Sequence, residues 1–295
     1  MSDLLYKKYK KYYLMLILPA LFLYVFSLVG PLIFGTIPSS FYDWNIIEGS
    51  RNFVGFNNYI RIFEDKNFIN SIIFTTKLAL FTIIGTNILA FAIALMINEK
   101  LFAKSVSRAM FFIPNIISGI MVSFVWTFIF TGAIPSVAKH LGMESIANIS
   151  WFGTPNMSAL AVIIVSIWQS TGFLMMLYIA GLQTIPDDVI EASKLDGCTG
   201  FKKIFYIQVP LLMPTITINL FVSIASAFKA FDIPLALTAG GPAKSTQTVA
   251  LNIYNDAFGA FRSGYASAKS VILFLIVALI TVIQLRITRK REVEA

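Results

Sequence analysis

The chain has 295 residues, of which 57% are hydrophobic and 13% charged, and its mean hydropathy is +0.77. Soluble domains carry about 25% charged residues, so this composition excludes an ordinary soluble enzyme. The 27 Phe residues exclude a disordered chain. One Cys and one His exclude a disulfide framework and a Cys/His metal site, and we expect no metal, no cofactor and no catalytic set.

Six stretches are apolar enough to cross a bilayer, which takes about 20 residues each. They predict an all-α, polytopic membrane protein with six transmembrane helices, at residues 14–34, 71–97, 109–131, 157–182, 209–235 and 266–285. The first is longer than the apolar region of a signal peptide, so we expect it to be retained. Between the first two, residues 57–63 predict a short helix lying at the membrane interface.

The basic residues predict the orientation. Fourteen of the 23 Lys and Arg residues fall at the N-terminus, after the second and fourth stretches, and in the C-terminal tail. Basic residues mark the cytoplasmic side, so both termini are expected there. The net charge of +8 is then a topology signal, and no nucleic-acid partner is needed to explain it.

Polar side chains gather on single faces of two predicted spans, where they are costly unless they face a cavity or another helix. Hydroxyl and amide groups beside an aromatic ring suit a sugar, although Ser residues also mediate helix packing. The candidate pathway residues are Ser166, Gln169, Ser170 and Phe173 with Trp168 nearby, then Asn219, Ser223, Ser226 and Lys229, and Asn115 in the third span.

Lys229 and Asp232 are intramembrane charges three residues apart. One interpretation is an ion pair at helical spacing with Lys229 snorkelling. The other is that Lys229 contributes to substrate choice by favouring an acidic sugar, and both residues belong to the candidate pathway. Lys77 and Lys269 lie near span ends and are expected to snorkel.

The connection after the fourth span predicts a short cytoplasmic helix. Pro186 can open it, acidic Asp187, Asp188 and Glu191 suit its first turns, and Gly197 can end it. From the pattern alone, an amphipathic surface helix explains these residues.

The same connection resembles a known motif. Glu191-Ala192-Ser193, three residues, Gly197, nine residues and Ile207-x-Val209-Pro210 resemble the EAA loop of ABC-importer permeases, E-A-A-x3-G-x9-I-x-L-P. Ser stands for the second Ala, and Val for Leu. The resemblance implies a coupling helix that docks in a cytoplasmic ATPase, with the coupling residues Asp187, Glu191, Ala192, Ser193, Asp196 and Gly197.

A second block resembles the carbohydrate-uptake branch of that family. Phe231-Asp232, Thr238-x-Gly240-Gly241-Pro242 and Phe53-x-Gly55 are similar to the MalF-type permease subunit. The resemblance implies a single transmembrane domain over residues 1–295, with a type I ABC-importer permease core at 71–285 and the EAA coupling loop at 186–210. It also implies half of the pathway of an ATP-driven, binding-protein-dependent importer of an oligosaccharide, in a prokaryotic cell membrane.

The partners follow from the same resemblance. They are a homologous second permease, two copies of a cytoplasmic ATP-binding subunit and an extracellular or periplasmic sugar-binding protein. Two alternatives remain: an ABC permease for another small solute, against which the Thr238–Pro242 block argues, and an ATP-independent secondary transporter. The latter would need an intramembrane carboxylate for ion coupling, for which Asp232 is the candidate, and would have no use for the EAA loop.

Overall fold

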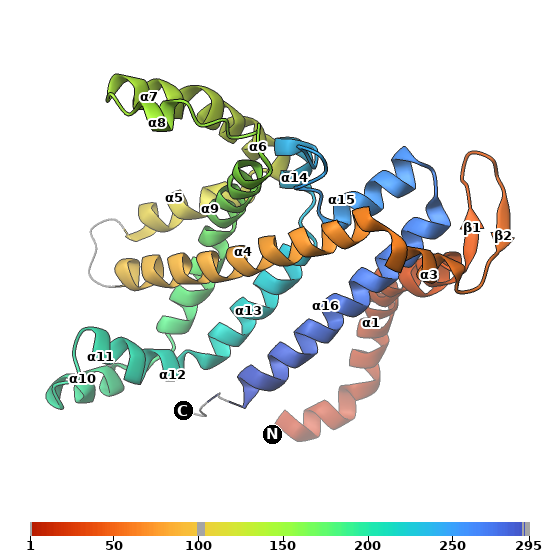
Figure 1. Ribbon diagram of the computed structural model, residues 1–295. Helices are drawn as coiled ribbons and strands as arrows, with labels where there is room; N and C mark the ends of the chain where they lie inside the picture. The colour runs from red at the N-terminus through yellow and green to blue at the C-terminus, as the bar shows by residue number, and fades with distance from the viewer. Residues whose placement is uncertain (1, 99–103, 291, 293–295) are drawn as a thin grey trace. The chain divides into compact units, whose positions relative to one another are not determined.

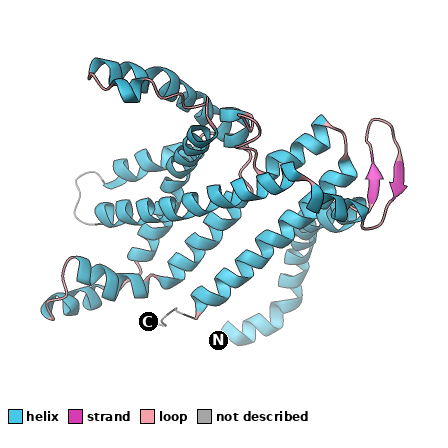
Figure 2. Cartoon of the chain, viewed as in Figure 1, coloured by secondary structure: helices cyan, strands magenta, loops and turns pink. Residues whose placement is uncertain are grey.

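The computed structural model describes residues 2–98, 104–290 and 292. The described chain is helical apart from one short hairpin and its loops (Figure 2). It divides into two compact units. The first unit comprises Met1–Glu64 and Ile253–Leu273, and the second comprises Asp65–Asn252 and Phe274–Ala295.

The first unit contains the long helix α1 and the only strands of the described residues (Figure 1). Its elements are α1 (Ser2–Gly30), the π-helical turn η1 (Pro31–Thr36), α2 (Ile37–Ser39), β1 (Tyr42–Trp44), β2 (Arg51–Phe53), α3 (Asn57–Glu64), η4 (Asn255–Gly259) and the first part of α16 (Ser263–Arg289). The antiparallel β1–β2 pair corrects the all-α expectation. α3 confirms the short helix expected at residues 57–63.

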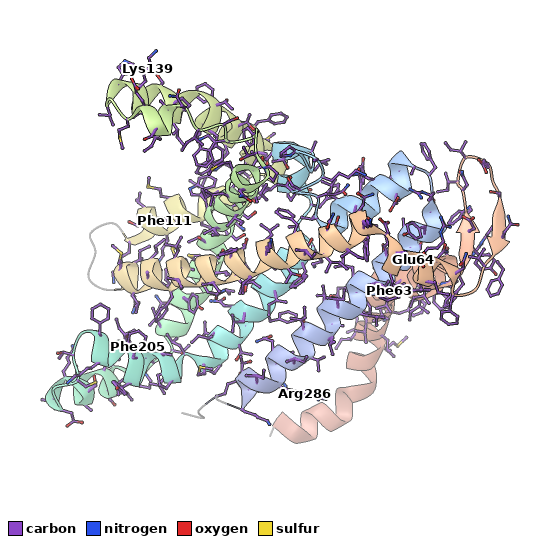
Figure 3. The ribbon with its side chains drawn as sticks, viewed as in Figure 1. Phe63, Glu64, Phe111, Lys139, Phe205 and Arg286 are labelled. Atoms are coloured by element: carbon purple, nitrogen blue, oxygen red, sulfur yellow. The ribbon has the colours of Figure 1, made fainter. Side chains whose placement is uncertain are left out.

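The second unit is built around α4 and α9, with α13 packed on both. In chain order it holds α4 (Lys66–Asn98), α5 (Lys104–Ile116), α6 (Gly119–Phe128), η2 (Ile129–Ala133), α7 (Ile134–His140), α8 (Glu144–Ala147), α9 (Pro155–Leu182), α10 (Asp187–Leu195), α11 (Phe201–Lys203), η3 (Ile204–Gln208), α12 (Val209–Leu211), α13 (Met213–Phe228), α14 (Asp232–Thr238), most of α15 (Val249–Tyr254) and the rest of α16. In Figures 1 and 3, α7 with Lys139 and the α10–α12 segment with Phe205 lie at opposite ends of this unit.

Five described helical segments are long and apolar enough to cross a membrane, or six if one bent pair counts as a single span. The second, fourth and sixth predicted stretches lie inside α4, α9 and α16. The first continues to Ser39 through η1 and α2, because its apolar character does not stop at Phe34.

The third predicted stretch is two helices rather than one. α5 ends at Ile116 and α6 begins at Gly119, with Ser118 in an extended conformation (φ −54°, ψ 138°). Pro114 has no N–H to donate within the helix, so α5 already lacks one backbone hydrogen bond just before the break. The membrane-length segment is instead Gly119–His140, shifted towards the next connection. Hydropathy reports composition and does not detect such a break.

The fifth predicted stretch is also broken. α12 and α13 meet at Leu212 in a bend of 75° between flanking helices, and α13 ends at Phe228, before α14 begins at Asp232. The Pro234 ring has no N–H to bond the carbonyl of Ala230. That carbonyl accepts a hydrogen bond from the Thr248 hydroxyl instead, at 2.8 Å, so the interruption is satisfied within the fold.

Small side chains let α4 and α9 approach closely. Ala90 and Ala94 of α4 are fully buried in one apolar cluster with Leu174, Met175 and Ile179 of α9. A polar network joins the same helices to α13: the Tyr178 hydroxyl donates to Asn87 Oδ1 at 2.8 Å, and Asn87 Nδ2 donates to Ser223 Oγ at 3.2 Å. Interhelical hydrogen bonds of this kind hold membrane helices in register.

Lys269, expected to snorkel, is 1% exposed at the start of α16. Its ammonium pairs with the carboxylate of Asp256 in η4, which also pairs with Arg262 at 3.0 Å. The Tyr265 ring lies 4.5 Å from the Lys269 nitrogen. The buried charge is therefore compensated locally, by a π-helical turn that the sequence pattern did not reveal.

Replacing Gly172 by Ala should destabilise the second unit. A Cβ at Gly172 would collide with the backbone carbonyl oxygen of Phe111, which cannot move independently of α5. We expect a loss of about 1–3 kcal/mol, seen as a lower unfolding midpoint of the detergent-solubilised protein. The matched control is Gly85→Ala, whose Cβ would meet only the side chain of Ile167, most closely its terminal Cδ1. Equal midpoints for the two variants would contradict the backbone contact as the cause.

Replacing Asp256 by Ala should leave the Lys269 ammonium buried with its carboxylate removed. Breaking a buried pair costs about 3–5 kcal/mol, so the unfolding midpoint should fall sharply. The double variant Asp256→Ala/Lys269→Met removes both charges and should recover most of the loss. A double variant no more stable than Asp256→Ala would refute the charge explanation.

Candidate functional site

A cavity of about 510 Å³ lies within the second unit. Its walls come from α4, from the α5–α6 break, from α9 and from the α13–α14 break. The α5–α6 break and the α13–α14 break therefore both border this cavity. Irregular backbone at membrane depth is tolerated where it lines a cavity or is buried in protein, which is the situation here.

Most of the candidate pathway residues come together around this cavity. The lining includes Asn115, Ser166, Gln169, Ser170, Phe173, Ser223, Ser226, Lys229 and Asp232. These residues come from three separated segments of the chain, yet they supply hydroxyl, amide, charged and aromatic groups to one space. Such convergence of a few polar groups in a largely preformed hollow is typical of a small-molecule site.

Trp168 and Asn219 lie outside the lining. The Trp168 ring meets that of Trp126 edge-on, with centroids 5.5 Å apart. Asn219 is fully buried, and its Nδ2 donates to the Leu174 carbonyl at 3.4 Å. Both residues share a helix with cavity residues but point towards neighbouring helices, a distinction that helical spacing within one span cannot make.

Gln169 has a structural task at the cavity wall. Its Nε2 donates to the carbonyl of Ile117, in the α5–α6 break, at 2.9 Å. That carbonyl faces a helix interruption, where the regular ladder is missing. The amide therefore ties α9 to the break and keeps the break open to the cavity.

Two wall serines use their hydroxyls within their own helices. Ser166 Oγ donates to Val162 O and Ser223 Oγ donates to Asn219 O, both at 2.7 Å. Each oxygen also has acceptor capacity, and Ser223 receives the Asn87 amide. Helix packing, the alternative kept open from the sequence, thus accounts for part of their bonding while they still line the cavity.

Sequence reasoning missed two hydroxyls contributed by α4. Thr82 and Thr86 line the cavity, and their side-chain oxygens are buried without a hydrogen-bond partner among the described residues. Buried polar groups normally have partners, so these two oxygens are a cost of packing α4 behind the cavity wall. Their i, i+4 spacing in the second predicted span was a usable signal.

The expected ion pair between Lys229 and Asp232 does not form. Lys229 caps the C-terminus of α13 and Asp232 is the first residue of α14, so the two do not share one continuous helix and lose the i, i+3 geometry. Within the described chain, the structure gives neither side chain an ion pair or hydrogen bond. Both are exposed to the cavity instead.

The motif after the fourth span forms α10. Pro186 precedes it in an extended conformation, Asp187 and Asp188 occupy its first turn, and Gly197 follows with a positive φ of 74°. The Cys198 amide closes this end by donating to Ser193 O at 2.8 Å. The structure therefore builds the expected short helix with the expected stop.

The two faces of α10 differ. Glu191, Ala192 and Asp196 are exposed, whereas Ser193 is 5% exposed and donates to Ile190 O. Ile185, just before α10, is buried in the α4–α9 apolar cluster, and Ile190 packs against that cluster. One face of the segment is thus anchored on the core, and the other is free to meet another molecule.

The chain is similar to known membrane components of transport systems. The profile of the family described as "Binding-protein-dependent transport system inner membrane component" matches residues 87–293. The chain is 39% identical over 285 residues, 96% of each chain, to a probable permease protein for transport of starch degradation products, AmyD of Thermoanaerobacterium thermosulfurigenes. It is 35% identical over 254 residues, 86% of this chain and 87% of the other, to the multiple sugar-binding transport system permease protein MsmF of Streptococcus mutans.

A solved structure shares the fold. A chain of the bacterial alginate ABC transporter, crystallised with an alginate-bound periplasmic protein, superposes with a TM-score of 0.80 over 97% of both chains. The sequence identity is 20%, so this likeness concerns the fold alone.

Replacing Gln169 by Leu should leave the Ile117 carbonyl without its donor at the cavity wall. The bond is exposed, so its loss should cost the net contribution of an ordinary hydrogen bond, about 0.5–1.5 kcal/mol, and the unfolding midpoint should fall by a small amount. Ser170→Ala is the control, since Ser170 also lines the cavity but makes no side-chain hydrogen bond among the described residues. If Ser170→Ala lowered the midpoint as much, the Gln169–Ile117 bond would not be the cause.

Proposed function

This chain belongs to the family of binding-protein-dependent transport system inner membrane components, and we propose that it forms half of the membrane pathway of an ATP-driven sugar importer. It is a permease subunit, a transport component rather than an enzyme. Energy enters through a separate ATPase, and the chain converts contact with that ATPase into a change of access at the cavity.

The observation that carries this proposal is the anchoring of α10. Ile185 and Ile190 attach the segment to the cluster formed by α4 and α9, and the same two helices continue into the cavity walls. A push on the exposed face of α10 therefore acts on a packed core, which transmits displacement because it is close to incompressible. Glu191, Ala192 and Asp196 would meet the ATPase, with Ser193 and Gly197 holding the helix in shape.

The proposed topology has six spans and both termini in the cytoplasm. Counting the bent pair Phe201–Leu211 and Met213–Phe228 as one span gives six crossings. This arrangement puts α10 on the cytoplasmic side together with the basic residues of both termini, as the positive-inside rule requires. The hairpin β1–β2 and the α7–α8 connection would then face the outside. The proposed permease core covers residues 71–285, within a single transmembrane domain of residues 1–295.

A sugar fits the cavity chemistry. Ser170, Ser226 and Gln169 offer hydrogen bonds to hydroxyl groups, and Phe173 offers an apolar face to a pyranose ring. Relatives named for starch degradation products and for multiple sugars support the same substrate class. An oligosaccharide is proposed because a cavity of about 510 Å³ in one subunit would be enlarged by a second.

The proposed assembly has four kinds of component. A sugar-binding protein delivers the sugar outside the membrane, this chain and a homologous permease enclose the pathway, and two ATP-binding subunits lie in the cytoplasm. The proposed location is the plasma membrane of a prokaryotic cell. ATP-driven closure of the two subunits would move α10 and redirect the cavity from one side of the membrane to the other.

Replacing Glu191 by Lys should prevent docking of the ATPase while leaving membrane insertion intact, because the residue is exposed on α10 and the core contacts lie on the other face. We expect at least a tenfold loss of ATPase co-purified with the tagged permease, and loss of sugar uptake. The control Glu144→Lys reverses an exposed charge on α8, at the other end of the unit, and should co-purify normally. Normal co-purification of Glu191→Lys would refute the coupling role.

A further inference from the structure

Lys229 is a cation without a partner at the cavity wall. It caps α13, lines the cavity and, among the residues that the structure describes, has no ion pair or hydrogen bond through its side chain. The α13 helix of 16 residues spans about 24 Å at 1.5 Å per residue, so Lys229 lies at the far end of this helix from the bend at Leu212.

The other charge at the cavity, Asp232, lies beside α6. The side chain of Asp232 rests against α6, since a Cβ added to Gly119 would lie 2.9 Å from Asp232 Cβ and 3.6 Å from its Oδ2. Lys229 and Asp232 are the charged residues of the lining, and they make no ion pair with each other. The cavity is therefore polarised, with a cation at the end of α13 and a carboxylate beside α6.

This polarity matches a particular kind of saccharide. A carboxylate is a good acceptor for sugar hydroxyls, whereas a free ammonium is best compensated by an anionic group through a charge-assisted hydrogen bond. The hydroxyl of Ser170, which lines the cavity, adds hydrogen-bonding capacity without adding charge. A neutral sugar would offer hydroxyls to Asp232 and Ser170 but no anionic partner to the Lys229 ammonium.

We propose that Lys229 is a specificity-determining residue that binds an anionic group of the transported saccharide, so that the substrate is an acidic sugar such as a uronic-acid oligosaccharide. Asp232 and the Ser170 hydroxyl then bind its neutral hydroxyl groups. The inference rests on the proposed sugar pathway and adds the charge of the substrate to it.

The first test measures the potential at the cavity without any sugar. The full chain carries Cys198→Ser and Ser226→Cys, since Ser226 is exposed to the cavity and lies one helical turn from Lys229. In membranes that contain the assembled complex, Cys at 226 is labelled with an anionic and with a cationic methanethiosulfonate. The ratio of the anionic to the cationic labelling rate, divided by the same ratio for a free thiol, should fall about tenfold in Lys229→Met. It should be retained in Lys229→Arg.

The control for this test is Lys77→Met. It removes the same charge from α4 at an exposed residue that does not line the cavity, so the rate ratio should stay unchanged. A ratio that changes less than twofold in Lys229→Met, or that changes equally in Lys77→Met, would overturn the role of Lys229.

The second test uses protection by sugars in the same membranes. A galacturonic-acid disaccharide should protect Cys at 226 from labelling at a concentration about tenfold lower than the neutral galactose disaccharide of the same linkage, and Lys229→Met should abolish the difference. Equal protection by the two sugars, or a difference that survives in Lys229→Met, would overturn the charge selection alone. Failure of both sugars to protect would overturn the sugar pathway itself.

Discussion

The constraint on which this structure depends is that a polar group inside a membrane must have a partner or face a cavity. The second unit meets it in two ways. Asn87, Tyr178 and Ser223 bond one another across α4, α9 and α13, so their polar groups become interhelical links. Thr82, Thr86 and Lys229 have no such partner among the described residues and lie at the cavity wall. The same constraint therefore produces both the packing and the site.

The helix breaks follow from this constraint. Pro114 and Pro234 remove N–H donors, and the carbonyls near them find other donors: Ile117 O accepts from Gln169, and Ala230 O accepts from Thr248. Once these bonds exist, the interrupted backbone can remain at membrane depth beside the cavity. A straight helix through residues 229–232 would hold Lys229 and Asp232 at i, i+3 spacing on one face, whereas the break leaves them without an ion pair. The proline positions thus shape the site as much as the polar side chains do.

Composition predicted a polytopic helical protein and the positions of α4, α9 and α16, because burial in lipid depends on apolar length. The breaks at Ile117–Ser118 and at residues 229–231 were not predicted, because apolar length says nothing about backbone continuity. Periodicity within one span brought Ser166, Gln169, Ser170 and Phe173 to the cavity but misplaced Trp168, whose orientation depends on Trp126. Lys269 was misjudged because its partner, Asp256, belongs to a π-helical turn. Each miss involves a second element that the local pattern does not contain.

The route from α10 to the cavity is physically short. The buried cluster begins at Ile185, runs along Leu182, Ile179 and Met175 of α9, and reaches Leu174, which lines the cavity. From Ser166 to Leu182, α9 is a single uninterrupted helix, about 24 Å long at 1.5 Å per residue. Under the proposed coupling, displacement of α10 would be transmitted along this continuous, close-packed helix and would shift the Gln169 amide. Because that amide bonds the Ile117 carbonyl in the α5–α6 break, the proposed movement would also alter this part of the cavity wall.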